Sequence, residues 1–361
     1  LLAFLLGVGF VFAPPLLSDD LYRYLWEGRL WLEGLNPYRL APNDPELTPF
    51  RDDLWRGINN KPLASIYPPL SQLLFVAAAW FGGKLWTFKL LALLGHVLAV
   101  GAMARMTASP KAPLALGLNP LLLSESALNG HFDVLCGLAL LLAARALARH
   151  RYVRAALATC TAVGLKLVGL VLLPLFARKP RALLGTALAS ALLVAPLAAS
   201  RGLSVPGSGP GQFAAHWRGN ESLFALFDWL SRQFFTEETA PLAARLIAAA
   251  SLLLLCMLAL KRALPPVQAA RLLLWGVLLL SPQVHPWYLA WLLPLEVAAG
   301  GTAGLVWSAA VLCAYAPLDL WQSEGVWRMP VWLQVVEYLV VAVALLVDPR
   351  RPSWRRPLAE P

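Results

Sequence analysis

Residues 240–260 read APLAARLIAAASLLLLCMLAL, an apolar run interrupted by one charged side chain, that of Arg245. A straight helix needs about 20 predominantly apolar residues to cross a bilayer, so this segment is long enough to span one. Further apolar segments lie at residues 1–17, 66–81, 85–104, 112–127, 131–148, 152–177, 180–199, 267–282, 284–299, 302–318 and 331–347. The sequence therefore predicts an all-α, polytopic transmembrane helical bundle of about 12 spans.

The composition of the 361 residues agrees with this prediction, because 59% are hydrophobic, 14% are charged and the mean hydropathy is +0.63. Soluble domains contain about 45–50% apolar and about 25% charged residues. A soluble enzyme, a disordered chain and a coiled coil are therefore excluded. We expect a single integral-membrane domain over residues 1–361. Its first segment, 1–17, is expected to be a retained helix, because no small-residue cleavage site follows it.

Many of the basic residues behind the net charge of +10 gather in short loops between apolar segments. The basic loops without an acidic residue lie at 105–111, 145–154, 178–181 and 261–262. Such loops stay on the cytoplasmic side, which explains the charge without nucleic acid as a partner. The long polar loops 18–65 and 200–239 then share the outer face. This topology requires that 66–81 is interfacial or half-inserted and that 152–177 is a hairpin broken near Lys166.

The first outer loop, 18–65, opens with Ser-Asp-Asp, a typical helix start in which Ser18 is the expected N-cap. The segment that follows, up to Glu33, predicts an amphipathic interfacial helix along the outer membrane surface. Capping accounts for one carboxylate, whereas Asp19 and Asp20 are adjacent. Two neighbouring carboxylates repel each other, and one of them is expected to have a raised pKa that suits a general base.

Charged residues beside apolar segments are costly, and they are usually paired or functional. Glu125 and Asp133 flank Asn129–His131. For Glu125 we favour a helix-end role, whereas for Asp133 a helix-end role and a functional role are equally open. The cations that are candidates for binding an anion at the outer face are Arg23, Lys61, Lys166, Arg201 and Arg218. The alternatives are a solvated helix face or an i,i+3 pair with Asp20 for Arg23, and snorkelling for Lys166.

Two prolines surround a histidine in Ser281-Pro-Gln-Val-His-Pro-Trp-Tyr288, which predicts a helix break with His285 at the outer mouth. Trp287 and Tyr288 fit either an interfacial aromatic belt or a sugar-binding site. His216 and Arg218 form a similar but weaker pattern in the second long loop. Carboxylates, cations and aromatic rings on one face of a membrane cavity suit an enzyme that acts on a lipid-linked phosphate.

These segments resemble integral-membrane glycosyltransferases of the GT-C class, especially bacterial polyprenol-phosphate-mannose-dependent mannosyltransferases. The matching stretches are Ser18–Gly28, Gly34–Tyr38, Ile66–Leu70, Asn129–Asp133, the segment around Lys166, His216–Arg218 and His285–Tyr288. The resemblance implies a GT-C fold and transfer of a hexose, expected to be mannose, from a polyprenyl-phosphate donor to a glycan or glycolipid acceptor. It further implies inversion at the anomeric carbon. The protein is then a multi-pass protein of the plasma (inner) membrane with an extracytoplasmic active site.

The resemblance also implies roles for individual residues. Relatives have an Asp followed four residues later by Tyr, which favours Asp20, with Tyr24, over Asp19 as the general base. His285 is expected near the acceptor or the donor phosphate. The other expected substrate or donor-phosphate contacts are Arg23, Lys61, Tyr67, His131, Asp133, Lys166, His216, Arg218, Trp287 and Tyr288. Many relatives have Asn where this chain has Phe132, so the pattern departs there.

Two other classes of protein stay open at the level of sequence. A lipid-linked sugar flippase or transporter uses the same cations and aromatic residues without a base, although transporters prefer charges at mid-membrane. A non-catalytic subunit of a membrane assembly tolerates Asp20→Asn. No compact set of metal ligands stands out, and the sequence leaves open one divalent cation held by Asp19 and Asp20.

Overall fold

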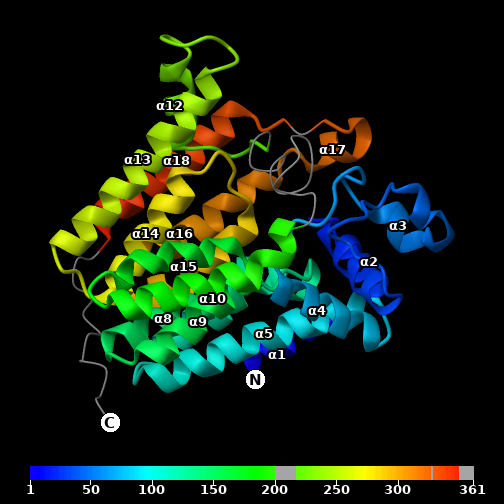
Figure 1. The fold of residues 1–361 in the computed structure, drawn as a ribbon, viewed down its shortest axis with the longest axis horizontal. Helices are drawn as coiled ribbons and strands as arrows, with labels where there is room; N and C mark the ends of the chain where they lie inside the picture. The colour runs from blue at the N-terminus through cyan, green and yellow to red at the C-terminus, as the bar shows by residue number, and fades with distance from the viewer. Residues whose placement is uncertain (200–216, 327, 349–361) are drawn as a thin grey trace.

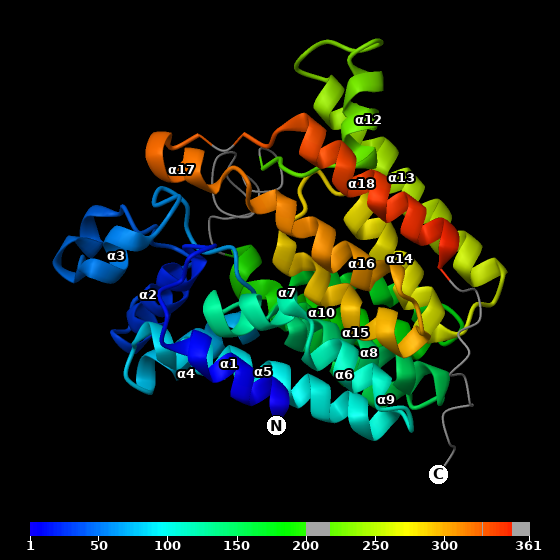
Figure 2. The same cartoon turned by 180° about the vertical axis from the view of Figure 1, so that it is seen from behind.

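The computed structural model describes residues 1–199, 217–326 and 328–348, and it is helical almost throughout (Figure 1). Within the described residues no strand forms, and an isolated parallel bridge joins Gly219 to Gln283. The all-α prediction is therefore confirmed. Figure 2 shows from behind how the N-terminal helix α1 (Leu2–Val11) lies along α5 (Leu85–Met106), with which it packs.

The helices of the first half follow one another as α2 (Asp20–Leu32), η1 (Pro45–Phe50), α3 (Asp53–Gly57), α4 (Pro69–Trp80), α6 (Lys111–Gly117), α7 (Pro120–Leu123), η2 (Ser124–Leu128), α8 (Asp133–Ala148), α9 (Tyr152–Leu165), η3 (Leu167–Phe176) and α10 (Pro180–Ala199). Those of the second half are α12 (Leu223–Ser231), α13 (Ala240–Lys261), α14 (Pro266–Leu280), η4 (Pro286–Tyr288), α15 (Leu289–Ala299), α16 (Ala303–Ala310), η5 (Val311–Tyr315), α17 (Leu318–Glu324) and α18 (Val331–Val347).

Four helical stretches in the described residues are long and apolar enough to cross a membrane. They are Leu85–Met106, Pro180–Leu197, Ala240–Lys261 and Ala303–Glu324. The other apolar helices have between 10 and 17 residues, and several of them are too short for a straight span. The prediction of about 12 spans therefore stays a prediction.

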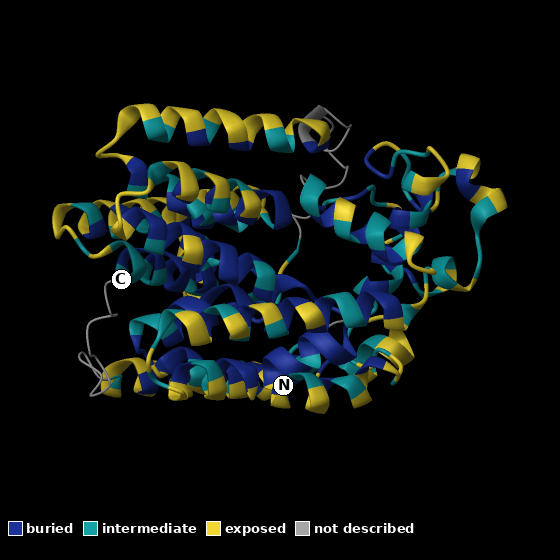
Figure 3. Ribbon diagram, turned by 90° about the horizontal axis from the view of Figure 1, so that it is seen from below, coloured by how far each residue is buried: buried dark blue, intermediate teal, exposed yellow. Residues whose placement is uncertain are grey.

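The surface of the bundle indicates a membrane protein. Large apolar side chains point outward along whole helices, as Leu184, Leu188 and Leu192 do on α10 and Leu339 and Val343 do on α18. In Figure 3 exposed positions lie on the outward faces of the helices, around a buried centre. A soluble monomer rarely exposes apolar patches of this extent.

The centre of the bundle is formed by α8 and α15, which pack against each other and are surrounded by α5, α9 and α14. Most residues of α8 and α15 are buried. Their contact is close because Gly137 has no side chain, and a Cβ at that position would overlap the carbonyl group of Ala290. The two helices start at the same end of the bundle, where the polar loops gather.

The structure confirms two helix breaks that the sequence predicts. Helix α9 ends at Leu165, Lys166 is extended, and η3 continues from Leu167. Helix α14 ends at Leu280, and η4 begins at Pro286. Both breaks interrupt apolar segments, and both lie beside the cavity described below.

Helix α2 is buried by protein along its N-terminal turns, although it is amphipathic as predicted. Leu21, Tyr24 and Leu25 are fully buried, and the helix packs on α4. The approach is close at Gly28, where a Cβ would overlap the carbonyl group of Phe75. The position of α2 at a membrane surface stays a prediction.

Candidate functional site

A cavity of about 870 Å³ opens at the end of the bundle where α2 begins. Its walls come from the start of α2, the loop 59–64, the break between α9 and η3, the segment 217–220 and the break before η4. The sequence-predicted residues that line it are Asp19, Asp20, Arg23, Tyr67, Lys166, Arg218, His285, Trp287 and Tyr288. Tyr24, His131 and Asp133 are buried and contact residues of the lining.

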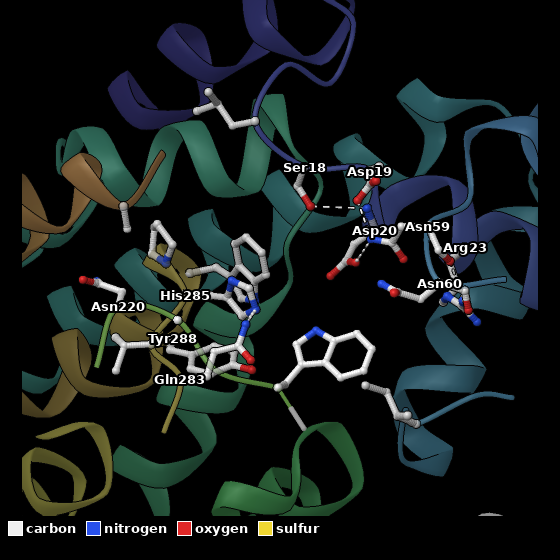
Figure 4. Close-up of a pocket in the computed structure, with 18 of the residues that line it drawn as sticks. Ser18, Asp19, Asp20, Arg23, Asn59, Asn60, Asn220, Gln283, His285 and Tyr288 are labelled. Carbon is white, nitrogen blue, oxygen red and sulfur yellow. Dashed lines mark hydrogen bonds between the residues drawn. The ribbon is translucent and has the colours of Figure 1, made fainter. Parts of the chain in front are cut away.

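The adjacent carboxylates have different partners (Figure 4). Asn59 Nδ2 donates to Asp19 Oδ1 at 2.5 Å and reaches Asp20 Oδ1 at 3.4 Å. Tyr24 donates its hydroxyl to Asp20 Oδ2 at 3.3 Å, as the four-residue spacing suggests. The backbone amide of Asp20 donates to Ser18 Oγ at 3.3 Å, so the serine satisfies an amide at the helix start. Figure 4 shows Asp20 and Asn59 on one wall and His285 on the facing wall.

A buried histidine behind the wall is bound between two carboxylates. His131 Nδ1 lies 2.8 Å from Glu125 Oε2, and His131 Nε2 lies 3.7 Å from Asp20 Oδ2. Glu125 also accepts from the hydroxyl of Tyr315 at 2.5 Å and from Asn129 Nδ2 at 3.3 Å. The structure therefore places Glu125 in direct contact with the candidate site, where the sequence favoured a helix-end role.

These groups, which lie outside the four candidate spans, have shifted pKa values. Burial and the neighbouring charge of Asp20 raise the pKa of Asp19 to about 6. Burial raises the pKa of Asp20, but His131 outweighs it and holds that pKa well below its usual range. Burial lowers the pKa of His131, yet Asp20 and Glu125 outweigh it and raise the pKa to about 9. Burial lowers the pKa of His285 to about 4. At neutral pH, Asp20 is ionised, His131 is charged and His285 is neutral.

Three rings form a stack that connects the two walls. The indole of Trp287 lies 4.0 Å from the ring of His131 and 4.2 Å from the ring of His285, and both pairs of rings are nearly parallel. The side-chain amide of Gln283 contacts His285 Nε2 at 2.5 Å.

Lys166 carries a positive charge on the cavity wall at the helix break. Its Nζ lies 3.3 Å from Asp133 Oδ1 and over the rings of Tyr67 and Phe132. Asp133 Oδ1 also accepts from Trp291 Nε1 at 2.7 Å, whereas Asp133 Oδ2 is buried without a hydrogen-bond partner. One carboxylate oxygen leaves much of the ammonium group's donor capacity unused, because Lys has three donors.

Two other predicted cations are occupied by protein carbonyl groups. The guanidinium of Arg23 donates to the backbone oxygens of Asn59, Asn60 and Leu63 at distances between 2.7 and 3.1 Å. Arg23 therefore fixes the loop that supplies Asn59 to the two aspartates. Lys61 donates to the carbonyl of Ile58 at 2.5 Å and does not line the cavity.

Arg218 is held by two carboxylates on the opposite wall. It donates to both oxygens of Glu221, at 2.6 and 2.7 Å, and to Asp228 Oδ2 at 2.8 Å. The same segment is joined to the His285 loop, since Val284 donates its amide to the carbonyl of Gly219 at 3.0 Å. His216 and Arg201, which the sequence also singles out, lie outside the described residues.

Sequence reasoning missed three residues of the site, namely Asn59, Gln283 and Tyr315. Each is neutral; Gln283 lies within the quoted Ser281–Tyr288 segment, whereas Asn59 and Tyr315 belong to no motif that the sequence analysis identified. Asn59 lies 39 positions from Asp20, and Tyr315 lies 190 positions from Glu125. The described residues contain no group of three or more His, Cys, Asp and Glu side chains that is suited to a metal ion.

An apolar helical bundle with an ionised carboxylate and a lysine on one cavity wall has the features of a membrane-embedded glycosyltransferase. Residues 3–179 match the family model described as alpha-(1->6)-mannopyranosyltransferase, N-terminal domain (MptA/B family). This match covers just under half of the chain and supports a glycosyltransferase of the GT-C type with a mannosyl-transfer role. The match includes Asp20, His131 and Lys166, whereas His285 lies beyond it. No curated protein and no solved structure matches the chain.

Proposed function

We propose that the cavity transfers a mannosyl group from a polyprenyl-phosphate donor to a hydroxyl group of a glycan or glycolipid, with inversion at the anomeric carbon. The observation that carries this proposal is Asp20, an ionised carboxylate on the cavity wall with a charged histidine 3.7 Å behind it. A base must be unprotonated at working pH and must be accessible to the acceptor. Asp20 meets both conditions, whereas the raised pKa that the sequence led us to expect of the base belongs to its neighbour Asp19.

In the proposed step, Asp20 takes the proton of the acceptor hydroxyl while the acceptor oxygen forms a bond to the anomeric carbon of mannose. The bond from that carbon to the phosphate oxygen breaks at the same time, and its electron pair stays with the phosphate. Attack from the face opposite the phosphate inverts the anomeric centre. Lys166 stabilises the negative charge of the leaving phosphate, because a fixed cation in a water-poor site is effective there.

A lipid-linked donor is supported by the apolar part of the cavity wall. Pro15, Leu16 and Leu17 line it before the aspartates, and Leu318 and Met329 line it from the C-terminal side. Leu16 is more than half exposed, which makes it a contact for a lipid chain that enters from the bilayer. The extracytoplasmic side is proposed from loop charge, because the basic loops, including 105–111 and 178–181, belong to the cytoplasmic face.

The test is single-turnover transfer from radiolabelled polyprenyl-phosphate mannose, with the protein in nanodiscs and a membrane extract as the acceptor pool. We expect wild type to form a labelled product and Asp20→Asn to lose at least about a hundredfold in rate, since a general base contributes about 10²–10⁴. The matched control is Asp53→Asn, which removes a carboxylate of the same loop whose side chain is 92% exposed. This control is expected to keep the wild-type rate.

Each other outcome has a definite meaning. Transfer by Asp20→Asn at the wild-type rate contradicts the assignment of the base. An equal loss in Asp53→Asn points to damage of the loop rather than to chemistry. Donor binding without transfer by wild type, together with movement of the donor across liposome membranes, favours the flippase that the sequence left open.

A further inference from the structure

The contact between His131 and Asp20 belongs to a longer buried chain. The hydroxyl of Tyr315 donates to Glu125 at 2.5 Å, Glu125 lies 2.8 Å from His131 Nδ1, and His131 Nε2 lies 3.7 Å from Asp20. Glu125 and His131 are each only 1% exposed. A carboxylate buried this deeply needs a partner charge, and the imidazolium supplies it.

The two nitrogens of His131 have unequal surroundings. Nδ1 is bound to Glu125, whereas Nε2 is buried without a hydrogen-bond partner, and Asp20 is the carboxylate nearest to it. The ring also stacks on Trp287 with 4.0 Å between centroids, a contact that favours the charged form. The raised pKa of His131, about 9, agrees with this geometry.

The two neighbouring aspartates therefore have different electrostatic surroundings. Asp20 faces the imidazolium of His131. Asp19 has a neutral hydrogen-bond partner, the amide of Asn59 at 2.5 Å, and stands next to the charge of Asp20. Two adjacent carboxylates titrate as a pair, and the first proton is taken up near pH 6. Either carboxylate can hold this proton unless another charged group makes one of the two sites more favourable.

We propose that the Glu125–His131 ion pair decides which of the two adjacent carboxylates holds the proton of the pair. It keeps Asp20 ionised and leaves the proton on Asp19. This inference rests on the proposed function in one respect, namely that Asp20 is the base. His131 and Glu125 are positioning residues, because they act through Asp20 and do not line the cavity.

Other charged and titratable groups face these residues and are left unchanged by the test. Those facing the aspartates are Arg23, Tyr24, Lys61, Tyr67, Lys166, His285, Tyr288 and Tyr315, and Asp133 faces His131. Of these, Lys166 and His285 act on Asp20 after His131. Lys166 and His285 are present in wild type and in the variants alike. A difference in pH dependence between wild type and a variant therefore reports on the Glu125–His131 ion pair.

The first test is the pH dependence of single-turnover transfer between about pH 5 and about pH 8. Wild type keeps its base when the pair takes up one proton, so its rate is expected to stay level. In His131→Gln the proton moves to Asp20, and the rate relative to wild type falls about tenfold per pH unit below about pH 6. At about pH 8 the variant approaches the wild-type rate, because both carboxylates are then ionised.

Glu125→Gln is the second variant, and it keeps His131 in place while removing its counter-charge. We expect the same loss at acid pH, with a smaller amplitude. The matched control is His96→Gln, which alters another fully buried histidine, whose ring nitrogens contact the carbonyl of Leu116 and the hydroxyl of Ser126 rather than a carboxylate. This control lowers the rate equally at every pH, if it lowers it at all. A loss in His131→Gln that is the same at every pH overturns the proposal.

The second test reads the proton directly and does not require turnover. At about pH 5, infrared difference spectra detect the carbonyl band of the protonated carboxylic acid. When His131 is present, Asp19→Asn is expected to remove this band and Asp20→Asn is expected to leave it. When His131→Gln is also present, Asp20→Asn is expected to remove the band and Asp19→Asn is expected to leave it. If Asp20→Asn alone removes the band seen in the wild-type spectrum, the proposal is overturned. If all bands behave as expected but the protein transfers no sugar, only the proposed function is overturned.

Discussion

Among the described residues, two clusters of charged side chains at opposite ends of the bundle differ in how completely their atoms are bonded. In one cluster, Arg271 donates to both oxygens of Glu296, at 2.5 and 2.9 Å, and to Asp348 at 2.5 Å. Glu296 also accepts from Trp275 Nε1, and Asp348 accepts from the backbone and hydroxyl of Thr302. Each of the four carboxylate oxygens has a partner.

The other cluster, beside the cavity, is incompletely bonded. Asp133 Oδ2 and His131 Nε2 are buried without hydrogen-bond partners, and Lys166 uses little of its donor capacity on protein. The two clusters lie at opposite ends of α14 and α15, because Arg271 and Glu296 are far along these helices from the break at His285.

This difference separates a structural ion pair from a reactive one. A charge whose donors or acceptors are all used inside the protein stabilises the fold and has no capacity left for a ligand. A buried charge with unused capacity next to a cavity is costly unless a ligand completes it. The comparison therefore predicts that substitutions in the two clusters affect different properties.

The largest effect is expected for Lys166→Met. Lys166 is the lysine that lines the cavity among the described residues, and its removal takes away the cation proposed to stabilise the leaving phosphate, so the transfer rate is expected to fall by about 10²–10³. The matched control is Lys61→Met, because Lys61 is a predicted phosphate contact that lies outside the lining and donates to the carbonyl of Ile58. Single-turnover transfer measures both. Equal losses in the two variants contradict the distinction between the lysines.

The next effect concerns the completely bonded cluster. Glu296→Gln leaves Arg271 facing the single charge of Asp348, and the free energy of unfolding is expected to fall by on the order of 3 kcal/mol. The transfer rate per folded molecule is expected to stay unchanged, since this cluster lies far from the cavity. Unfolding in detergent followed by tryptophan fluorescence, together with transfer by the folded fraction, checks both. If Glu296→Gln loses transfer activity while its free energy of unfolding stays unchanged, the structural role of this cluster is contradicted.

A smaller effect tests the packing that holds the reactive cluster in place. Gly28→Ala pushes α2 away from the carbonyl of Phe75, and a cost of about 1–3 kcal/mol is expected for such overpacking. Gly9→Ala is the matched control, because a Cβ at Gly9 meets no atom within 4 Å. The same unfolding measurement compares them. If Gly28→Ala unfolds with the same free energy as wild type, α2 is free to move away from α4 and the close packing of the two helices is not required.

The sequence predicted the local features of the fold, because these depend on neighbouring residues. The break at Lys166 and the break between Ser281 and Tyr288 follow from a charge within an apolar run and from prolines, whereas the N-cap of α2 is Asp19 and not, as predicted, Ser18. Span number could not be predicted in the same way. Apolar segments of similar composition form helices from 10 to 22 residues long, so composition alone does not determine the length of each helix.

The candidate site was predicted in part for the same reason. Charged residues such as Asp20 and Lys166 are conspicuous in an apolar chain, so they could be selected without a structure. The contacts that determine their chemistry join distant segments. Nothing near Glu125 in the sequence indicates that it binds both His131 and Tyr315, and Asn59 is a neutral residue in a polar loop.

The most direct test of the incompletely bonded cluster is a structure of the protein bound to a phosphonate analogue of polyprenyl-phosphate mannose that cannot transfer its sugar. The account predicts that the phosphonate oxygens bind Lys166 and that the anomeric carbon lies on the side of the cavity that faces Asp20. A donor bound at the Arg271–Glu296 end of the bundle, or a phosphonate remote from Lys166, contradicts it.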